Sequence, residues 1–185
     1  AGIVFADLEP EAVDLPFGTM TGSGVIFGVT GGVTEAVIRR VSPDKSLASL
    51  RNLAFEGVRG FDGIKEYEIL ADDTTLKICV VNGLGNVAKV MERIKNGEKY
   101  HLIEVMACPN GCIGGGGQPI CDGKELAGVR GENLHFLDRN SKIRFSHENQ
   151  DVAKLYQNFL EHPLSHKSHM ILHTDHNAWS MHEEQ

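Results

Sequence analysis

The sequence predicts an α/β fold in which a sheet is flanked by helices. Three observations support this prediction. Strand-like runs alternate with helical patterns, glycines and prolines mark the ends of these segments, and the most unusual motif directly follows a predicted strand. In α/β sheets, ligand sites lie beyond the carboxyl ends of the strands. The motif therefore stands where a functional site is expected.

Two helices are predicted in the first half of the chain, after an acidic and irregular start. The first covers residues 32–41, where apolar side chains keep helical spacing until Pro43 ends the pattern. The second covers residues 44–57 and places several leucines on one face. Residues 24–32, taken alone, indicate a strand that turns into the first helix through a glycine pair.

The middle of the chain predicts two strands, a helix and a third strand. Asp72 and Asp73 form a predicted turn between the first two strands, and Gly97 ends the helix. In order, these elements are strand 64–70, strand 75–81, helix 86–95 and strand 101–106. A later helix is predicted at residues 150–160, and its candidate buried side chains are Val152, Leu155, Tyr156, Phe159 and Leu160.

Composition excludes two classes of partner. The 185 residues include 25 acidic and 18 basic side chains, a formal net charge of -7 that argues against a nucleic-acid surface. No apolar run approaches the roughly 20 residues that a membrane helix needs. We expect a soluble, cytoplasmic protein. Because the chain starts at Ala1 rather than at methionine, we also expect a processed chain or an excised piece.

The four cysteines differ in their surroundings. Cys79 lies in an apolar strand-like run, which predicts a buried packing residue. Cys108 and Cys112 are four residues apart in a glycine-rich turn, where thiolates can face an iron-sulfur cluster. Cys121 follows the same run, and we favour a spare thiol over a ligand there. This clustering suits metal or redox chemistry in a reducing, anaerobic compartment.

Two segments carry a family resemblance. Residues 104–119 read EVMACPNGCIGGGGQP, and this string resembles the last cluster-binding motif of the iron-only ([FeFe]) hydrogenases. Residues 24–36 read GVIFGVTGGVTEA and resemble the glycine-rich segment of that family, which walls the active-site pocket and then enters a helix. The chain end at residues 167–174 is also similar to the family's structural tail. We therefore favour a structural role over zinc binding for His169 and His173.

The resemblance implies an H-cluster, in which a [4Fe-4S] cubane is joined through a cysteine sulfur to a diiron centre. Cys108 would ligate the cubane and Cys112 would supply the joining sulfur. The residues implied to line the catalytic pocket are Phe27, Val33, Met106 and Cys112. The residues implied to let the backbone approach the cofactor are Gly28, Gly114, Gly115 and Gly116.

This sequence also departs from the family pattern. The two earlier motifs that supply the remaining cubane cysteines and the proton-passing thiol are not in the chain. Asn110 replaces a common glycine, which is tolerable even in a left-handed conformation, and Thr34 stands where many relatives have methionine. The resemblance therefore implies that residues 1–185 are the C-terminal part, one lobe, of a hydrogenase catalytic domain. Residues 175–185 would be a tail extension.

Several functions remain open at this point. The resemblance implies part of an enzyme that oxidises hydrogen and reduces protons, completed by the N-terminal part of the domain or by a partner subunit. Its electron partner would be ferredoxin or a nicotinamide-linked protein. The alternatives are a hydrogenase-like protein of iron-sulfur cluster assembly, a sensory relative without rapid turnover, and a piece that binds nothing. Residues 82–85 form a turn after a strand, but Ala88 replaces the third glycine of a nucleotide-binding motif.

Overall fold

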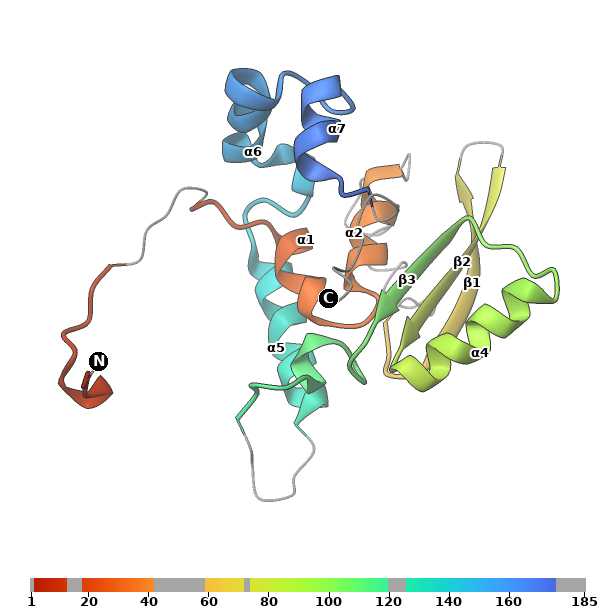
Figure 1. Ribbon diagram of the computed structural model, residues 1–185, viewed down its shortest axis with the longest axis horizontal. Helices are drawn as coiled ribbons and strands as arrows, with labels where there is room; N and C mark the ends of the chain where they lie inside the picture. Colours follow the sequence, from red (N-terminus) through yellow and green to blue (C-terminus); the bar gives the residue numbers. More distant parts are fainter. Residues whose placement is uncertain (1, 13–17, 42–58, 72–73, 120–125, 176–185) are drawn as a thin grey trace, which may run out of the picture.

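The computed structural model describes residues 2–12, 18–41, 59–71, 74–119 and 126–175. It contains a three-stranded sheet with helices on both faces (Figure 1). The strands are β1 (Ile64–Ala71), β2 (Thr74–Asn82) and β3 (Leu102–Met106), in the spatial order β1-β2-β3. The main helices are α2 (Gly32–Val41), α4 (Leu84–Lys95), α5 (Ala127–Asn140), α6 (Gln150–Leu155) and α7 (His166–Leu172).

The sheet confirms the predicted strands and their order. β1 pairs antiparallel with β2, with Ile64 opposite Val81, and β3 pairs parallel with β2, with Ile78 opposite Leu102. β2 lies between the other two strands and is the most buried of the three. Parallel strands need a crossover connection, which α4 provides between β2 and β3. The turn predicted at Asp72 and Asp73 lies outside the described residues, as does the helix predicted at 44–57.

The two faces of the sheet have separate apolar cores. On one face, Ile38 of α2 packs with Ile78 and with half-buried side chains that include Leu102. On the other face, Val90 of α4 packs with Cys79 and Val81, all almost fully buried. The sequence-based prediction that Cys79 is a packing residue is confirmed. Burial also raises the pKa of the Cys79 thiol, so it remains protonated near neutral pH.

Residues 24–32 do not form the strand that their pattern, taken alone, indicates. The chain forms a short helix, α1 (Gly22–Val25), followed by a 3-10 turn, η2 (Ile26–Gly28). The Thr21 hydroxyl caps α1 by accepting a hydrogen bond from the Gly24 amide at 3.1 Å. A Cβ on Gly22 would lie 2.2 Å from a carboxylate oxygen of Asp138, so glycine here allows α1 to pack closely on α5.

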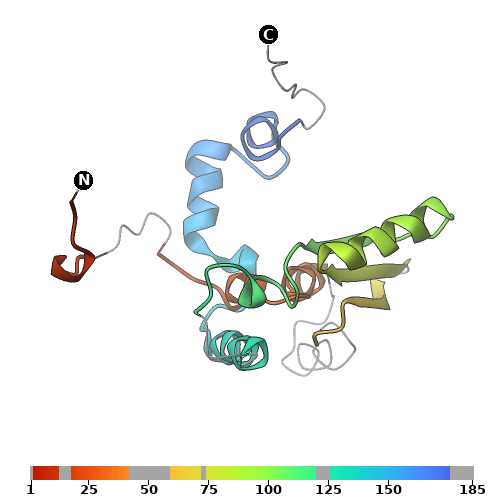
Figure 2. The same ribbon diagram turned by 60° about the horizontal axis from the view of Figure 1, so that its bottom comes forward.

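The C-terminal third differs most from the sequence-based prediction. Helix α5 was not predicted, because its buried face consists of Ala127, Gly131, His135 and Asp138, which give no apolar periodicity. The helix predicted at 150–160 is present as α6 and a π-helical turn, η6 (Tyr156–Leu160). Of its candidate core residues, Leu160 is buried, whereas Val152 and Phe159 are exposed. The physical reason is visible in Figures 1 and 2, where α6 and α7 stand apart from the sheet.

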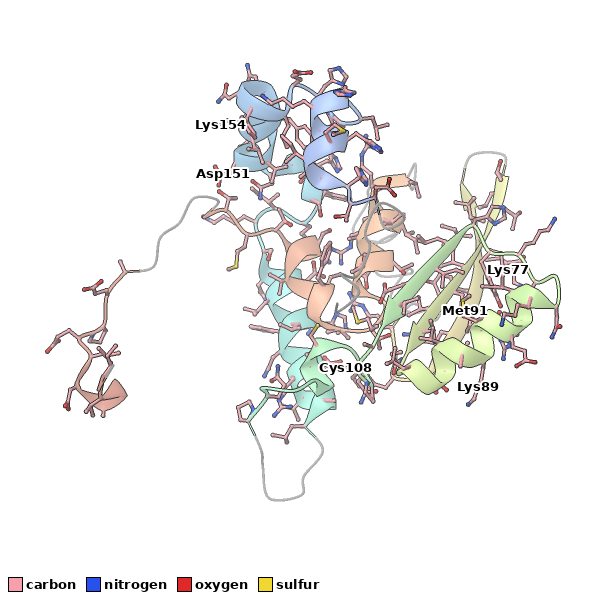
Figure 3. The ribbon with its side chains drawn as sticks, viewed as in Figure 1. Lys77, Lys89, Met91, Cys108, Asp151 and Lys154 are labelled. Carbon is pink, nitrogen blue, oxygen red and sulfur yellow. The ribbon has the colours of Figure 1, made fainter. Side chains whose placement is uncertain are left out.

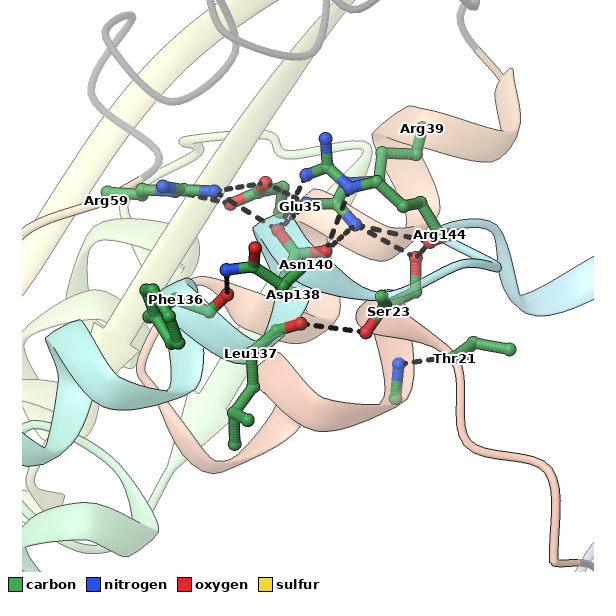
Figure 4. A network of polar contacts seen from close by, with 12 residues as sticks. Thr21, Ser23, Glu35, Arg39, Arg59, Phe136, Leu137, Asp138, Asn140 and Arg144 are labelled. Atoms are coloured by element: carbon green, nitrogen blue, oxygen red, sulfur yellow. Dashed lines mark hydrogen bonds and ion pairs between the residues drawn. The ribbon is translucent and has the colours of Figure 1, made fainter.

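A buried ionic cluster, consisting of Glu35, Arg39, Arg59, Asp138 and Arg144, joins α2 to α5 (Figure 4). Asp138 accepts hydrogen bonds from Arg39 at 2.8 Å and from Arg144 at 2.7 Å. Glu35 accepts bonds from Arg39 at 2.6 Å and from Arg59 at 2.9 Å. Burial alone would raise the pKa of both carboxyl groups, but their arginine partners outweigh burial and lower both pKa values.

No helix in the described part of the chain is both long and apolar enough to cross a membrane.

Candidate functional site

The cysteine string, residues 104–119, starts within β3 and continues beyond the carboxyl end of this strand, as the sequence predicts. Cys108, which is labelled in Figure 3, is half-buried. Cys112 is exposed, and both thiols are free of disulfide bonds. Cys112 begins a 3-10 turn, η4 (Cys112–Gly114). Cys121 lies outside the described residues. Two free thiols are thus presented on one turn, at the sheet edge where α/β proteins place their ligands.

Left-handed backbone shapes the turn between the two cysteines. Asn110 has a φ of 64° and Gly111 has a φ of 91°. The Gly111 amide donates to the Cys108 carbonyl at 3.2 Å, and the Gly114 amide donates to the Gly111 carbonyl at 3.0 Å. Asparagine tolerates the left-handed region better than most residues, which explains how Asn110 can stand in place of a glycine.

Close packing explains several glycines of the string. A Cβ on Gly111 would lie 2.8 Å from the Gly28 carbonyl oxygen, the Thr30 amide nitrogen and the Met106 sulfur. A Cβ on Gly114 would lie 2.3 Å from the Pro109 carbonyl oxygen, and one on Gly115 would lie 3.2 Å from the Cys108 sulfur. A Cβ on Gly116 would meet no atom within 4 Å. The string therefore packs tightly against neighbouring protein atoms up to Gly115, whereas Gly116 has open space where a side chain would stand.

Asn82, at the end of β2, clamps the cysteine string to the glycine-rich segment. Its side-chain oxygen accepts a hydrogen bond from the Asn110 amide at 2.9 Å, and its side-chain nitrogen donates to the Asp62 carbonyl at 2.9 Å. The Thr30 amide in turn donates to the Asn110 carbonyl at 3.1 Å. Asn82 is almost fully buried. The prediction of a structural turn at residues 82–85 missed this contact, which depends on tertiary register.

Glu104 makes a second tie, from β3 to the start of α2. Its carboxylate accepts hydrogen bonds from the Gly31 amide at 2.6 Å, the Thr34 amide at 2.7 Å and the Thr34 hydroxyl at 2.7 Å. The carboxylate is buried against a helix N-terminus, where negative charge is favourable. Thr34, a departure from the family pattern, is therefore satisfied by a partner on the strand that leads into the cysteine string.

Arg130 of α5 supports the other end of the cysteine string. Its guanidinium donates to the Ile113 carbonyl at 3.0 Å and to the Pro119 carbonyl at 2.8 Å. The Gln118 side chain donates to the Cys112 carbonyl at 3.3 Å. No sequence signal pointed to Arg130, because the prediction lacked α5.

Two cavities are lined by four of the predicted site residues, two in each. One, of about 340 Å³, has lining residues from η2, the cysteine string and α5: Gly28, Cys112, Ile113, Gln118, Arg130, Asn133 and Leu134. The other, of about 240 Å³, lies between α2 and β3 and brings Val33 together with Met106. Phe27 lines neither of these two cavities and is 44% exposed.

The donor groups of the described residues can be compared with the needs of an iron-sulfur cluster. A [4Fe-4S] cubane takes four cysteine thiolates, and the cysteine string offers Cys108 and Cys112 on an open glycine turn. Within the described ranges, no group of three or more His, Cys, Asp or Glu residues is placed to hold a metal ion. The donor chemistry thus fits one side of an iron-sulfur site, with further ligands needed.

Comparison with family models divides the chain into two matched segments. The model described as the C-terminal domain of the iron only hydrogenase large subunit matches residues 1–116. The model described as the iron hydrogenase small subunit matches residues 124–179. The buried ionic cluster joins them, because Arg39 belongs to the first segment and Asp138 to the second.

Individual relatives include hydrogenases and cluster-assembly factors. NADP-reducing hydrogenase subunit HndD of Solidesulfovibrio fructosivorans is 46% identical over 173 residues, which cover 93% of this chain and 30% of the relative. The cytosolic Fe-S cluster assembly factor narfl of Xenopus tropicalis is 29% identical over 184 residues, which cover 96% of this chain and 38% of the relative. The chain therefore spans about a third of the length of these relatives.

Solved structures agree with the family models. The [FeFe]-hydrogenase HydA1 from Chlamydomonas reinhardtii matches with a TM-score of 0.59 and 36% sequence identity, over 91% of this chain and 49% of that one. The α/β fold of this chain, a three-stranded sheet with flanking helices, thus matches part of the fold of these enzymes. The chain belongs to the iron-only hydrogenase family.

Proposed function

We propose that this chain forms one side of an H-cluster site and that, completed by further polypeptide, it takes part in reversible hydrogen oxidation. The observation that carries the proposal is the cysteine string itself. Two free thiols stand on a turn that Asn82 and Glu104 tie to the glycine-rich segment. In this proposal residues 1–174 are the C-terminal part of a catalytic domain, followed by a tail.

The proposed roles follow the resemblance, residue by residue. Cys108 holds the cubane, and Cys112 supplies the sulfur shared with the diiron centre. Met106 and Val33, which line one cavity, face the diiron side. Gly28, which shares the other cavity with Cys112, leaves room for the cofactor, and Gly114 to Gly116 let the backbone come close to it. Phe27, which is partly exposed, would be covered once the site is complete.

The protein's own contribution is positioning. The bound cluster supplies the redox chemistry, and the chain fixes where its thiols stand. The Asn82 clamp sets the turn relative to η2, and Glu104 sets β3 relative to α2. We expect a reducing, anaerobic setting and a ferredoxin or nicotinamide-linked electron partner. The HndD relative, which is named as NADP-reducing, favours the nicotinamide-linked partner.

The similarity to narfl favours a second candidate, an iron-sulfur assembly protein without hydrogen turnover. The two candidates differ in the cofactor. An assembly protein would hold ordinary cubanes, whereas a hydrogenase needs the diiron centre with its carbonyl and cyanide ligands.

One experiment separates the candidates. The chain is matured anaerobically with hydrogenase maturation factors, alone and together with the half of a hydrogenase chain that it does not match. Hydrogen evolution and infrared bands of carbonyl and cyanide only in the mixture would support the proposal. A folded mixture that binds iron and sulfide but has neither signal would favour the assembly protein.

A further inference from the structure

One side chain holds both ends of the glycine run, residues 114–117. Arg130 of α5 donates a hydrogen bond from Nη1 to the Ile113 carbonyl at 3.0 Å and a second bond from Nη2 to the Pro119 carbonyl at 2.8 Å. The two nitrogens belong to one planar guanidinium group, whose N–H directions are fixed relative to each other. The side chain of Arg130 therefore sets the spacing between Ile113 and Pro119 across the loop.

The glycine run has no side chains of its own with which to pack. A Cβ on Gly116 or Gly117 would meet no atom within 4 Å. The Gly115 amide donates to the Cys112 carbonyl at 3.0 Å, which closes the turn locally but does not tie it to another element. Because glycine has more backbone freedom than any other residue, the conformation of this run depends on the hydrogen bonds at its two ends.

Helix α5 holds Ile113 through its side chain as well as through its backbone (Figure 1). The Ile113 side chain is buried in a small apolar core that includes Ala127 and the half-buried Leu134. These two residues of α5 lie about one helical turn before and one turn after Arg130. Ile113 directly follows Cys112 in the chain, so α5 fixes the backbone next to the exposed thiol.

Arg130 and Cys112 share a cavity but belong to different segments of the chain. Both line the cavity of about 340 Å³, in which Arg130 is half-buried. Cys112 lies in the segment that matches the large-subunit model, residues 1–116, and Arg130 lies in the segment that matches the small-subunit model, residues 124–179. The two bonds of Arg130 therefore connect the second segment to the thiol-bearing turn of the first.

We propose that Arg130 is a positioning residue for the cluster site, and that its two-point bridge keeps Cys112 in place while a cluster is bound. Arg130 acts through the backbone of Ile113 and Pro119 and does not ligate the cluster. The identity of the bound group rests on the proposed function. The bridge itself is present in the chain without iron, so its effect on the turn can be measured there.

The first test uses the iron-free 185-residue chain and measures amide exchange of Gly114 and Gly115 by NMR. Both amides donate to carbonyls within the turn at 3.0 Å. Arg130→Gln removes the bridge and should speed their exchange at least about tenfold, because hydrogen bonds from a charged donor are among the stronger ones. Amides of β2 should keep their wild-type rates, which checks the fold. Unchanged exchange of Gly114 and Gly115 would overturn the proposal.

Two further variants separate the bridge from the charge and from general effects on α5. Arg130→Lys keeps the positive charge but lacks the rigid pair of N–H donors, so both glycine amides should exchange nearly as fast as in Arg130→Gln. Wild-type exchange rates in Arg130→Lys would reject the bridge in favour of charge alone. Arg139→Gln is the matched control on the same helix. The Arg139 side chain is 50% exposed and 3.9 Å from Glu132, so its loss should leave both rates unchanged.

The second test measures how firmly a bound cluster is held. The chain is matured anaerobically together with the portion of subunit HndD that it does not match, and iron release to a chelator of ferrous iron is followed by absorbance. Arg130→Gln should release iron at least about tenfold faster than the wild type, as is usual when a residue that supports a metal ligand is lost. Arg139→Gln should match the wild type. Equal release from the Arg130→Gln and wild-type mixtures would overturn the role of Arg130 in holding the cluster.

Hydrogen evolution by the wild-type mixture tests the proposed function separately. A mixture that releases iron faster in Arg130→Gln but never evolves hydrogen would reject the hydrogenase proposal and leave the role of Arg130 intact. Hydrogen evolution by the wild type, with unchanged amide exchange and iron release in Arg130→Gln, would do the reverse. If the wild-type mixture binds no iron, the proposed function fails, and amide exchange in the iron-free chain decides whether Arg130 positions the turn.

Discussion

The buried ionic cluster and the cysteine string differ in whether their functional groups are paired within the chain or left accessible. In the ionic cluster, every carboxylate oxygen of Glu35 and Asp138 accepts at least one bond from an arginine of the same chain. In the cysteine string, the backbone is held firmly, while Cys112 remains exposed and Cys108 half-buried. One region pairs its carboxylates within the chain, and the other leaves its thiols accessible.

This difference distinguishes polar residues that stabilise the fold from residues that are available to bind a ligand. A buried charge without its partner is costly, so a structural cluster has to contain its full set of partners. A ligand-binding group needs positioning but must keep its reactive atom available. Asn82 and Glu104 combine features of both regions. Their own polar groups are satisfied by hydrogen bonds, and these bonds position the backbone segments that lie next to the thiols.

The largest effect is expected at Cys112. In an assembled and matured enzyme, Cys112→Ala should reduce hydrogen evolution to background, because it removes the sulfur proposed to join the two iron centres. Cys79→Ala is the matched control. It truncates a buried side chain, so it should cost about 1–2 kcal/mol of unfolding free energy without abolishing activity per folded molecule. Full activity of the Cys112 variant would remove that residue from the site.

The next largest effect is expected in the ionic cluster. Asp138→Ala removes the carboxylate that pairs with Arg39 and Arg144, of which Arg39 keeps Glu35. It should lower the free energy of unfolding by about 3–5 kcal/mol, measured in urea. Glu132→Ala on the same helix is the control. Its carboxylate is exposed and 3.9 Å from Arg139, so its loss should change stability by less than about 1 kcal/mol. Similar losses of unfolding free energy in both variants would mean that burial of the cluster adds nothing to stability.

A smaller effect is expected within the turn that separates the cysteines. Gly111→Ala places a Cβ 2.8 Å from two backbone atoms at a positive φ. It should cost about 1–3 kcal/mol and lower cluster content, measured as bound iron per chain. Asn110→Gly occupies the neighbouring left-handed position and should be tolerated. If the two variants retain the same iron content, close packing at Gly111 is not needed.

The smallest effect is a dependence of stability on pH. Burial and the nearby Arg59 charge lower the pKa of His135 below its ordinary value of 6.5. The unfolded chain therefore binds more protons, and stability should fall as pH decreases below about 6.5, by at most about 1.4 kcal/mol per pH unit for one proton. The lowered pKa values of Glu35 and Asp138 add a further loss in more acidic solution, below their unfolded values.

Urea midpoints between pH 4 and 8 measure this dependence. His135→Gln should flatten the upper part of the curve and leave the acidic loss in place. A wild-type curve that stays flat from pH 8 to 5 would contradict the assignment to His135.

Local patterns in the sequence predicted the sheet and the position of the cysteine turn beyond a strand end. Helix α2 has the predicted bounds, and the strands differ from prediction by at most one residue at each end. The cysteines were recognisable because rare residue types recur at short spacing. Helix α5 was missed because its contacts come from glycine, alanine and charged groups. The role of Arg130 depends on α5, and that of Asn82 on strand register, so neither could be read from neighbouring residues.

The ionic cluster also sets the order of events during synthesis. Arg39 and Asp138 are 99 residues apart in the chain. At translation rates of about 5–20 residues per second, Arg39 emerges roughly 5–20 s before its partner. Until then α2 cannot bury that side chain at low cost, and closing so long a loop is intrinsically slow. The packing of α2 against α5 through this cluster therefore cannot form until α5 has been synthesised.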